Sequence, residues 1–234
     1  MSKIVLLDNH DSFVYNLVDA LHGYDFTAFR NTVSVETVLA EDPALIILSP
    51  GPGYPAEAGC MMSLLDEALA RRIPVLGICL GFQALLEHFG GKVEPCGPVH
   101  GKSEVMELTS SGVAHPVFAG LAVDSAPEIP DHVGRKVPVA RYHSLGSKAV
   151  ECPQGIVSLA TTETDIGPVI MAATTADSMA IGLQFHPESI LTPAGPTILN
   201  RCLETLLRAD SADGADSADS ADSAEHTDPE TDQQ

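Results

Sequence analysis

The chain has 234 residues, 44% of them hydrophobic, which is enough for one large domain with a substantial core. Its 32 Asp and Glu against 12 Lys and Arg give a formal net charge of −20, so it offers no basic footprint for nucleic acid. No apolar run reaches membrane-spanning length, and the first residues lead straight into an apolar strand without the layout of a secretory signal. We therefore expect a cytoplasmic protein with neither a nucleic-acid partner nor a membrane partner.

The cysteines are spread along the chain, and no two of them have the Cys-x-x-Cys spacing. This spacing argues against a zinc site and against a disulfide framework. The five cysteines are Cys60, Cys79, Cys96, Cys152 and Cys202.

Residues 209–234 differ sharply in composition from the rest of the chain. From Asp210 to Gln234 there are nine acidic residues and no Lys or Arg, and the segment repeats Ala-Asp-Ser. Without aliphatic side chains larger than Ala, burial cannot offset the conformational entropy that ordering would cost. We expect a folded domain at residues 1–208 and an acidic disordered tail at residues 209–234.

Apolar strands and amphipathic helices alternate up to Gly91. Helices are expected to begin at Asp11 or Ser12, at Ser34, near residue 60, and directly after Cys79. The expected strands between them cover residues 3–8, 26–30, 44–49 and 75–78. This alternation predicts an α/β fold with a doubly wound, mostly parallel central sheet and helices on both faces.

The C-terminal half is β-rich. Its short alternating segments either extend the first sheet or form a small second layer, and the pattern leaves this open. They cover residues 93–96, 103–108, 137–142, 156–161 and 169–173. A last strand over residues 179–185 is followed by a helix that begins near Pro196 and packs on the core.

Cys79 stands where an apolar strand turns into a helix, within the pattern Gly-x-Cys-x-Gly. A cysteine in an apolar segment is more often a buried structural residue. The glycines at positions 77 and 81 favour a nucleophile instead, because they relieve crowding at a sharp strand-to-helix turn. The helix N-terminus also favours a thiolate there.

His186 is the histidine best placed to serve such a nucleophile. It follows an apolar strand directly, and Glu188, two residues later, projects to the same side of an extended chain. Pro187 stiffens the turn between them. The pair has the form of a base with its orienting carboxylate. Metal ligation is the alternative, but no third ligand stands at a suitable spacing.

Three segments together resemble the signatures of class I, triad-type, glutamine amidotransferases: residues 77–83, 49–53 and 185–189. Residues 7–16, 100–102 and 141–145 further resemble the amidotransferase subunits of anthranilate synthase and of aminodeoxychorismate synthase. The resemblance extends from residue 3 to about residue 207. The family commonly has His where this chain has Phe82, and this difference concerns packing beside the turn.

The resemblance implies a catalytic triad. Cys79 would attack the side-chain amide of glutamine, and His186 would pass a proton to the departing ammonia. Glu188 would orient His186. The resulting thioester would then hydrolyse to glutamate.

The resemblance also implies a substrate and oxyanion site. The backbone N–H groups of Leu80 and Gly53 would form the oxyanion hole, in a tight loop that includes Gly51 and Pro52. Alone, such a Pro-Gly loop is more often an ordinary turn. Further substrate contacts are implied for the amino-acid end of glutamine, from Gln83, Ser144 and Leu145.

The partner implied is a chorismate-using synthase, component I of anthranilate synthase, with L-glutamine as the substrate of this chain. No metal or other cofactor is implied in this chain, and Mg²⁺ is implied on the partner subunit. The alternatives are an aminodeoxychorismate synthase partner, a subunit shared by both enzymes, a non-catalytic binding module on the same fold, and a freestanding cysteine hydrolase.

Deleting residues 210–234 should leave activity and the melting temperature almost unchanged at moderate salt, because this segment has no large apolar side chain to dock. Thermal unfolding of the full-length and truncated chains measures this. A melting temperature several degrees lower in the truncated chain would show that the tail packs on the domain.

Overall fold

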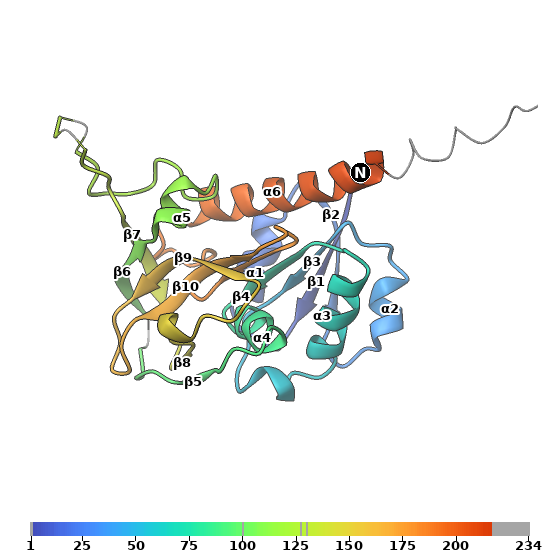
Figure 1. Cartoon of the computed structure of the whole chain (residues 1–234). Helices are drawn as coiled ribbons and strands as arrows, with labels where there is room; N and C mark the ends of the chain where they lie inside the picture. The colour runs from blue at the N-terminus through green and yellow to red at the C-terminus, as the bar shows by residue number, and fades with distance from the viewer. Residues whose placement is uncertain (1, 100, 127, 130, 217–234) are drawn as a thin grey trace, which may run out of the picture.

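A nine-stranded sheet forms the centre of the part of the chain that the computed structural model describes, which is residues 2–99, 101–126, 128–129 and 131–216. Its strands lie in the order β2-β1-β3-β4-β11-β10-β9-β6-β7 (Figure 1). Their bounds are Lys3–Asp8 for β1, Asp25–Arg30 for β2, Leu45–Leu48 for β3, Val75–Ile78 for β4, Lys102–Leu108 for β6, Lys136–Arg141 for β7, Ile156–Thr162 for β9, Val169–Thr175 for β10 and Ala180–Leu183 for β11.

Five neighbouring strands, β2, β1, β3, β4 and β11, pair in parallel. Their carboxyl ends therefore meet at one edge of the sheet, where the working sites of doubly wound folds lie. The central strand β4 pairs on one side with β3 and on the other with β11. Cys79 follows β4 directly, and His186 lies shortly after β11.

The remaining strands β10, β9, β6 and β7 continue the same sheet in antiparallel pairing. The C-terminal half therefore extends the first sheet, which answers the question that the sequence left open. A separate pair of short strands, β5 (Glu94–Pro95) and β8 (Leu145–Gly146), forms a second small sheet. The α/β fold predicted from the sequence is confirmed.

The helices cover both faces of the sheet because successive side chains of each strand point to opposite faces. In β1, Ile4 and Leu6 pack in the cluster that includes residues of α1 (Val14–Ala20) and α6 (Gly195–Asp216). Val5 and Leu7 pack in the opposite cluster, with residues of α2 (Val35–Leu39), α3 (Met61–Ala70) and α4 (Leu80–His88). Figure 1 shows α6 on one side of the sheet and α3 and α4 on the other.

Two helix starts follow from side-chain caps. The hydroxyl of Ser34 accepts the backbone N–H of Thr37 and begins α2 as expected. The expected cap of α1 by Asp11 or Ser12 is wrong, because Phe13 is the N-cap residue and no side chain caps this helix; the Asp11 carboxylate accepts the backbone N–H of Phe13 just before it. Helix α5 (Ser110–Ala114) was not expected; the Thr109 hydroxyl accepts the Gly112 N–H at its start.

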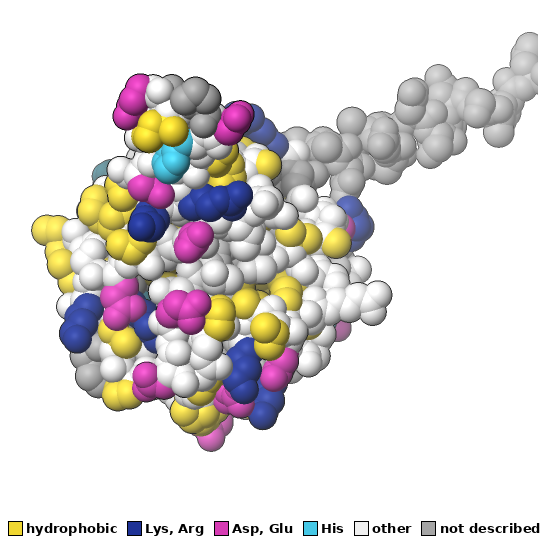
Figure 2. All heavy atoms as spheres, turned by 60° about the vertical axis from the view of Figure 1, so that its left-hand side comes forward, with side chains coloured by type: hydrophobic (Ala, Val, Ile, Leu, Met, Phe, Trp, Pro, Cys, Tyr) yellow, Lys and Arg dark blue, Asp and Glu magenta, His cyan; other side chains and the backbone are white. Residues whose placement is uncertain are grey.

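Two features bear on the ends and the surface of the chain. Helix α6 continues to Asp216, so residues 209–216, which we expected in the tail, are helical. Residues 217–234 lie outside the described residues, and the disordered tail stays a prediction. None of the described helices combines the length and the apolar character needed to cross a membrane. On the face shown in Figure 2, described Lys and Arg side chains lie among acidic and hydrophobic ones.

Phe82 occupies the place that Gly182 leaves open in β11. Its side chain is fully buried, and a Cβ added to Gly182 would lie 1.9 Å from the Phe82 ring. The ring therefore packs against Gly182 between α4 and β11. The difference from the family's usual His is accommodated by packing beside the turn.

Gly182→Ala should destabilise the protein by about 1–3 kcal/mol, since the new methyl group would overlap the Phe82 ring. Urea unfolding at equilibrium measures the change. The double variant Gly182→Ala with Phe82→Leu should lose at least about 0.5 kcal/mol less stability than the sum of the two single variants. The reason is that the smaller side chain at position 82 relieves the overlap. Full additivity, or a Gly182→Ala variant as stable as the parent chain, would contradict this packing.

Candidate active site

Cys79 forms the sharp corner between β4 and α4. Its φ of 51° and ψ of −99° lie where a non-glycine residue is strained, at a cost of about 1–3 kcal/mol. The backbone N–H of Cys79 donates to the carbonyl of Leu183 over 2.7 Å, which ties the corner to β11. The residue is 9% exposed.

Glycines allow the chain to close tightly on both sides of this corner. A Cβ on Gly77 would lie 2.5 Å from the carbonyl oxygen of Gly81. A Cβ on Gly81 would lie 2.3 Å from the carbonyl oxygen of Leu48 in β3. Both approaches are shorter than any real Cβ contact, so neither position accepts a side chain without movement of the backbone. The Gly-x-Cys-x-Gly spacing is thus explained by close packing of strand, turn and helix.

His186 and Glu188 form a buried hydrogen-bonded pair beside this corner. Nδ1 of His186 lies 2.6 Å from Oε1 of Glu188, and the two side chains are 4% and 0% exposed. Burial alone lowers the pKa of His186, but the interactions with Cys79 and then with Glu188 outweigh it and raise this pKa to about 10. The three predicted triad residues are therefore brought together, with the imidazole between sulfur and carboxylate.

Two aromatic rings enclose the imidazole, and the sequence reasoning did not assign them to the site. The rings of Tyr142 and Phe13 meet the ring of His186 edge-on, with centroids 5.0 Å and 5.5 Å away. The Tyr142 hydroxyl lies 3.2 Å from the hydroxyl of Ser189. These contacts fix the tilt of the imidazole and keep water away from it. Both aromatic residues stand in segments quoted for the resemblance, which was the available signal.

The predicted oxyanion loop is held against the start of α4. The Ser49 hydroxyl accepts the backbone N–H of Asn9 over 2.9 Å and donates to the Pro50 carbonyl over 2.7 Å. A Cβ on Gly51 would lie 2.7 Å from Asn9 and 2.8 Å from the side chain of Leu80. Gly51 and Leu80 are therefore neighbours, and the loop lies at the start of α4.

The tip of this loop is open to solvent. Pro52 and Gly53 are exposed, and Gly53 has a φ of +78°, which favours glycine. A Cβ there would lie 3.1 Å from the Glu57 carboxylate. The loop tip is thus exposed and has the Glu57 carboxylate as a near neighbour.

The residues predicted for the amino-acid end of the substrate lie in two segments that touch. The Nε2 of Gln83 donates to the Leu145 carbonyl over 3.2 Å, and Gln83 is 3% exposed. Ser144 is exposed, and its carbonyl accepts the N–H of Cys96 over 2.8 Å. The structure therefore brings Gln83 and Leu145 together, with Ser144 beside them at the surface. His100, in another quoted segment, lies outside the described residues.

Gln184 is a polar neighbour of Cys79 that the sequence reasoning missed. Its side chain is fully buried, its Nε2 lies 3.7 Å from the Cys79 sulfur, and its Oε1 accepts Nε2 of Gln83 over 3.3 Å. The available signal was a single amide in the otherwise apolar run 179–185, two residues before His186.

A buried polar network supports the segment that carries Leu145. His143 Nδ1 donates to the Leu145 carbonyl over 2.7 Å, and His143 Nε2 accepts Nε of Arg141 over 3.1 Å. Arg141 also donates to Glu104 over 2.9 Å. Burial, followed by the neighbouring Arg141 charge, lowers the pKa of His143 to about 3. His143 is therefore neutral and carries its proton on Nδ1.

The other cysteines lack these surroundings. Burial raises the pKa of the thiols of Cys60, Cys96, Cys152 and Cys202, which keeps them protonated and weakly nucleophilic. The structure records all five cysteines as free thiols. Within the described residues, no group of three or more His, Cys, Asp or Glu side chains is placed to hold a metal ion.

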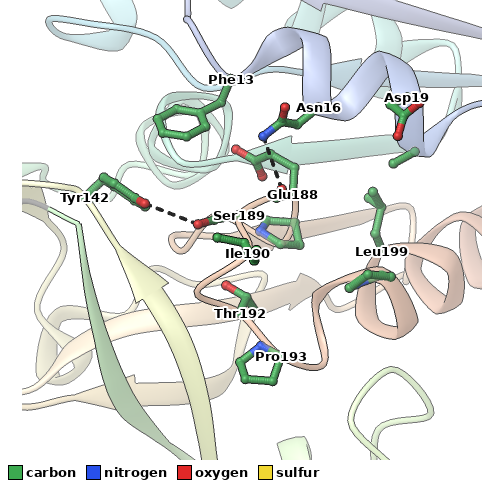
Figure 3. Close-up of a pocket in the computed structure, with 13 residues that line it drawn as sticks. Phe13, Asn16, Asp19, Tyr142, Glu188, Ser189, Ile190, Thr192, Pro193 and Leu199 are labelled. Carbon is green, nitrogen blue, oxygen red and sulfur yellow. Dashed lines mark hydrogen bonds between the residues drawn. The ribbon is translucent and has the colours of Figure 1, made fainter.

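A cavity of about 600 Å³ lies on the far side of the triad, next to Glu188 and away from Cys79. Figure 3 shows it between α1 and the segment that follows β11, with the Asn16 amide directed at the backbone carbonyl of Glu188. Tyr142 reaches Ser189 at its rim (Figure 3). Its lining includes neither Cys79 nor the loop 49–55. The identification of Cys79 as the nucleophile therefore rests on the geometry of the turn and not on this cavity.

The comparison with known families agrees with this geometry. The family model of class-I glutamine amidotransferases matches residues 5–206. The chain belongs to this family. It is therefore an enzyme of the amidotransferase class, and the resemblance seen in the three short segments is confirmed.

Several curated relatives match this amidotransferase chain over nearly their full lengths. Anthranilate synthase component 2 of Corynebacterium glutamicum is 64% identical, with 88% of this chain and 99% of the relative covered. The pyocyanine-specific component 2 of Pseudomonas aeruginosa is 43% identical, with 86% and 92% covered. Component 2 of Haemophilus influenzae is 39% identical, with 88% and 99% covered.

Solved structures agree on the fold. A glutamine amidotransferase from Thermotoga maritima has a TM-score of 0.66 at 19% identity, with 88% of this chain and 98% of that chain covered. One from Methylobacillus flagellatus has a TM-score of 0.56 at 17% identity, with 98% of each chain covered. At these identities the likeness shows the amidotransferase fold alone.

His143→Gln should make stability less dependent on pH on the acidic side. The folded-state pKa of His143, about 3, lies below the ordinary 6.5, so between these values the unfolded chain binds a proton that the native chain does not. Stability from this group is therefore present above pH 6.5 and lost as the pH falls toward 3. Glutamine can still donate and accept hydrogen bonds, but it does not titrate. As the pH falls, the free energy of unfolding of His143→Gln should therefore decrease less steeply than that of the parent chain, by up to about 1.4 kcal/mol per pH unit.

Urea unfolding at a series of pH values measures this effect, with His22→Gln at an exposed position as the matched control. The control should leave the slope unchanged. An identical slope in His143→Gln and the parent chain would contradict a neutral buried His143.

Proposed function

We propose that this chain is the amidotransferase subunit of an anthranilate synthase and that it releases ammonia from glutamine through Cys79, His186 and Glu188. The observation that carries the proposal is the contact of a strained, turn-held Cys79 with a buried His–carboxylate pair. The relatives named anthranilate synthase component 2 support the choice of synthase, since they match the chain over nearly their full lengths. They favour anthranilate over aminodeoxychorismate as the product.

In the first half of the reaction, the Cys79 thiolate attacks the side-chain amide carbon of glutamine. A carbon–sulfur bond forms, and the negative charge moves to the amide oxygen. The protonated imidazole of His186 then gives its proton to the amide nitrogen, and the carbon–nitrogen bond breaks. Ammonia departs, and the acyl group remains bound to Cys79 as a thioester. The raised pKa of His186 supports this role, because it keeps the imidazole protonated and ready to give its proton to the leaving nitrogen.

In the second half, the neutral imidazole takes a proton from water as the water oxygen attacks the thioester carbon. Collapse of the tetrahedral intermediate expels the Cys79 thiolate and leaves glutamate. Glu188 keeps the His186 Nδ1–H in place throughout, so that the opposite nitrogen handles the proton each time. The ring contacts from Tyr142 and Phe13 hold the imidazole at a fixed tilt.

The negative charge on the amide oxygen needs donors that are already in position. We assign them to the backbone N–H groups of Leu80 and Gly53. The N-terminus of α4 contributes its partial positive charge to the same place. The close approach of Gly51 to Leu80 supports the assignment, because it brings the loop to the start of the helix.

Gln83, Ser144 and Leu145 are assigned to the amino-acid end of glutamine. The contact between Gln83 and the Leu145 carbonyl supports a shared site. The ammonia would pass to a synthase subunit that binds chorismate and Mg²⁺, and the partner therefore determines the final product.

Cys79→Ala should abolish glutamine-dependent synthesis, with a loss of at least about 1,000-fold, because no other group can form the thioester. Synthesis from added ammonium salt should persist, since free ammonia bypasses this subunit. The measurement is product formation by the purified subunit with its synthase, supplied with chorismate and either nitrogen source. The matched control is Cys152→Ala, a half-buried cysteine whose raised thiol pKa makes it unreactive.

Glutamine-dependent synthesis near the parent level in Cys79→Ala would refute the triad. Reconstitution with an aminodeoxychorismate synthase but not with an anthranilate synthase would keep the triad and change the partner.

A further inference from the structure

A side-chain amide lies against the nucleophile from the segment between β11 and His186. Gln184 Nε2 is 3.7 Å from the Cys79 sulfur, within hydrogen-bonding distance for a sulfur acceptor. Gln184 is 0% exposed, so water does not compete for this amide. The mechanism above does not use it.

The direction of this amide follows from the groups around it. The Leu145 carbonyl can only accept, and it faces the side chain of Gln83 at 3.2 Å. Gln83 must therefore turn its NH₂ group toward Leu145. The same NH₂ group lies 3.3 Å from the side chain of Gln184, which must present its oxygen there. This leaves the NH₂ group of Gln184 facing Cys79.

A second group fixes the Leu145 carbonyl itself. It accepts Nδ1 of His143 over 2.7 Å. The tautomer of His143 is imposed in turn by Arg141, which only donates and faces Nε2 at 3.1 Å. In each hydrogen bond from Arg141 through His143 to the Leu145 carbonyl, and from that carbonyl through Gln83 to Gln184, the donor and the acceptor are therefore fixed.

We propose that Gln184 donates a hydrogen bond to the sulfur of Cys79 and stabilises its thiolate, and that Gln83 is a positioning residue that keeps the Gln184 amide turned this way. This inference rests on the proposed function in one respect, which is that Cys79 is the nucleophile.

The donor helps both halves of the reaction. A hydrogen bond to a charged group is about twice as strong as one between neutral groups, so it favours the thiolate over the thiol. A thiol pKa lower by one unit gives about tenfold more thiolate below that pKa, while the intrinsic nucleophilicity falls only about threefold. The same donor stabilises the thiolate when it leaves the thioester.

Few charged groups face the sulfur, so an effect of Gln184 can be separated from theirs. His186 faces it directly, with Glu188 beyond. On the helix side, α4 carries no charged residue before Glu87. The loop 49–55 carries no charged residue either, and its one titratable side chain is Tyr54. Arg141 lies beyond the two glutamines.

The test is the pH dependence of Cys79 alkylation by iodoacetamide, resolved from the other four cysteines by peptide mass spectrometry. Gln184→Met keeps the length of the side chain and removes the donor. It should raise the alkylation midpoint of Cys79 by about one pH unit, the lower end for a hydrogen bond to a charged group, because the sulfur contact is long. Gln154→Met, at an exposed position, is the matched control and should not shift the midpoint.

The positioning part is tested by Gln83→Met and by the double variant. Without Gln83 the Gln184 amide can turn over, so the midpoint should rise by less than in Gln184→Met. The double variant should match Gln184→Met alone, because the two residues act through one hydrogen bond. Additive shifts would contradict the positioning role of Gln83.

An unchanged midpoint in a folded Gln184→Met chain, with near-ultraviolet circular dichroism like the parent, would overturn the proposal. If Gln184→Met fails to fold, Gln184→Glu keeps the shape and polarity and should raise the midpoint by more, since a carboxylate would face the thiolate. The alkylation midpoint is read without glutamine or a synthase. A failed assignment of Cys79 as the nucleophile would appear as glutamine-dependent synthesis near the parent level in Cys79→Ala, and this outcome is separate from the titration.

Discussion

The backbone corner at Cys79 is the constraint on which the site depends. The neighbouring strand β4 lies between two parallel strands, and the Cys79 N–H is bound to Leu183 of β11. Gly77 and Gly81 let the turn close against β3 with no room for a side chain. Strain of about 1–3 kcal/mol is held by this pairing, and in return the sulfur stands at the helix N-terminus with His186 beside it.

Strand β11 and the residues directly after it are the second organising element, because the stretch that follows the strand supplies two side chains to the sulfur. Gln184 and His186 are separated by one buried residue, Phe185, and both approach Cys79. Gly182 in the same strand receives the Phe82 ring. The packing of α4 on β11 and the polar contacts of the nucleophile are thus set by one short segment.

The sequence predicted the parallel strands and the Cys79 turn because these depend on local patterns: apolar runs, glycine spacing and cap residues such as Ser34. The His186–Glu188 pair was predictable for the same reason, since two residues in a stiff turn stay close. The order of β6, β7 and β9 was not, because their pairing depends on contacts between distant segments. Gln184 and the Arg141–His143 network were missed since their partners come from other strands and from α4.

The central claim is that Cys79 becomes covalently acylated by glutamine, and a quenched-flow experiment tests it most directly. The subunit is mixed with glutamine in the presence of its synthase, quenched in acid within milliseconds, and mapped by mass spectrometry. The account predicts a glutamyl group, glutamine minus ammonia, on the peptide containing Cys79 and on no other cysteine peptide. Glutamate release at the normal rate with Cys79 unmodified throughout the time course, or blocked beforehand, would contradict it.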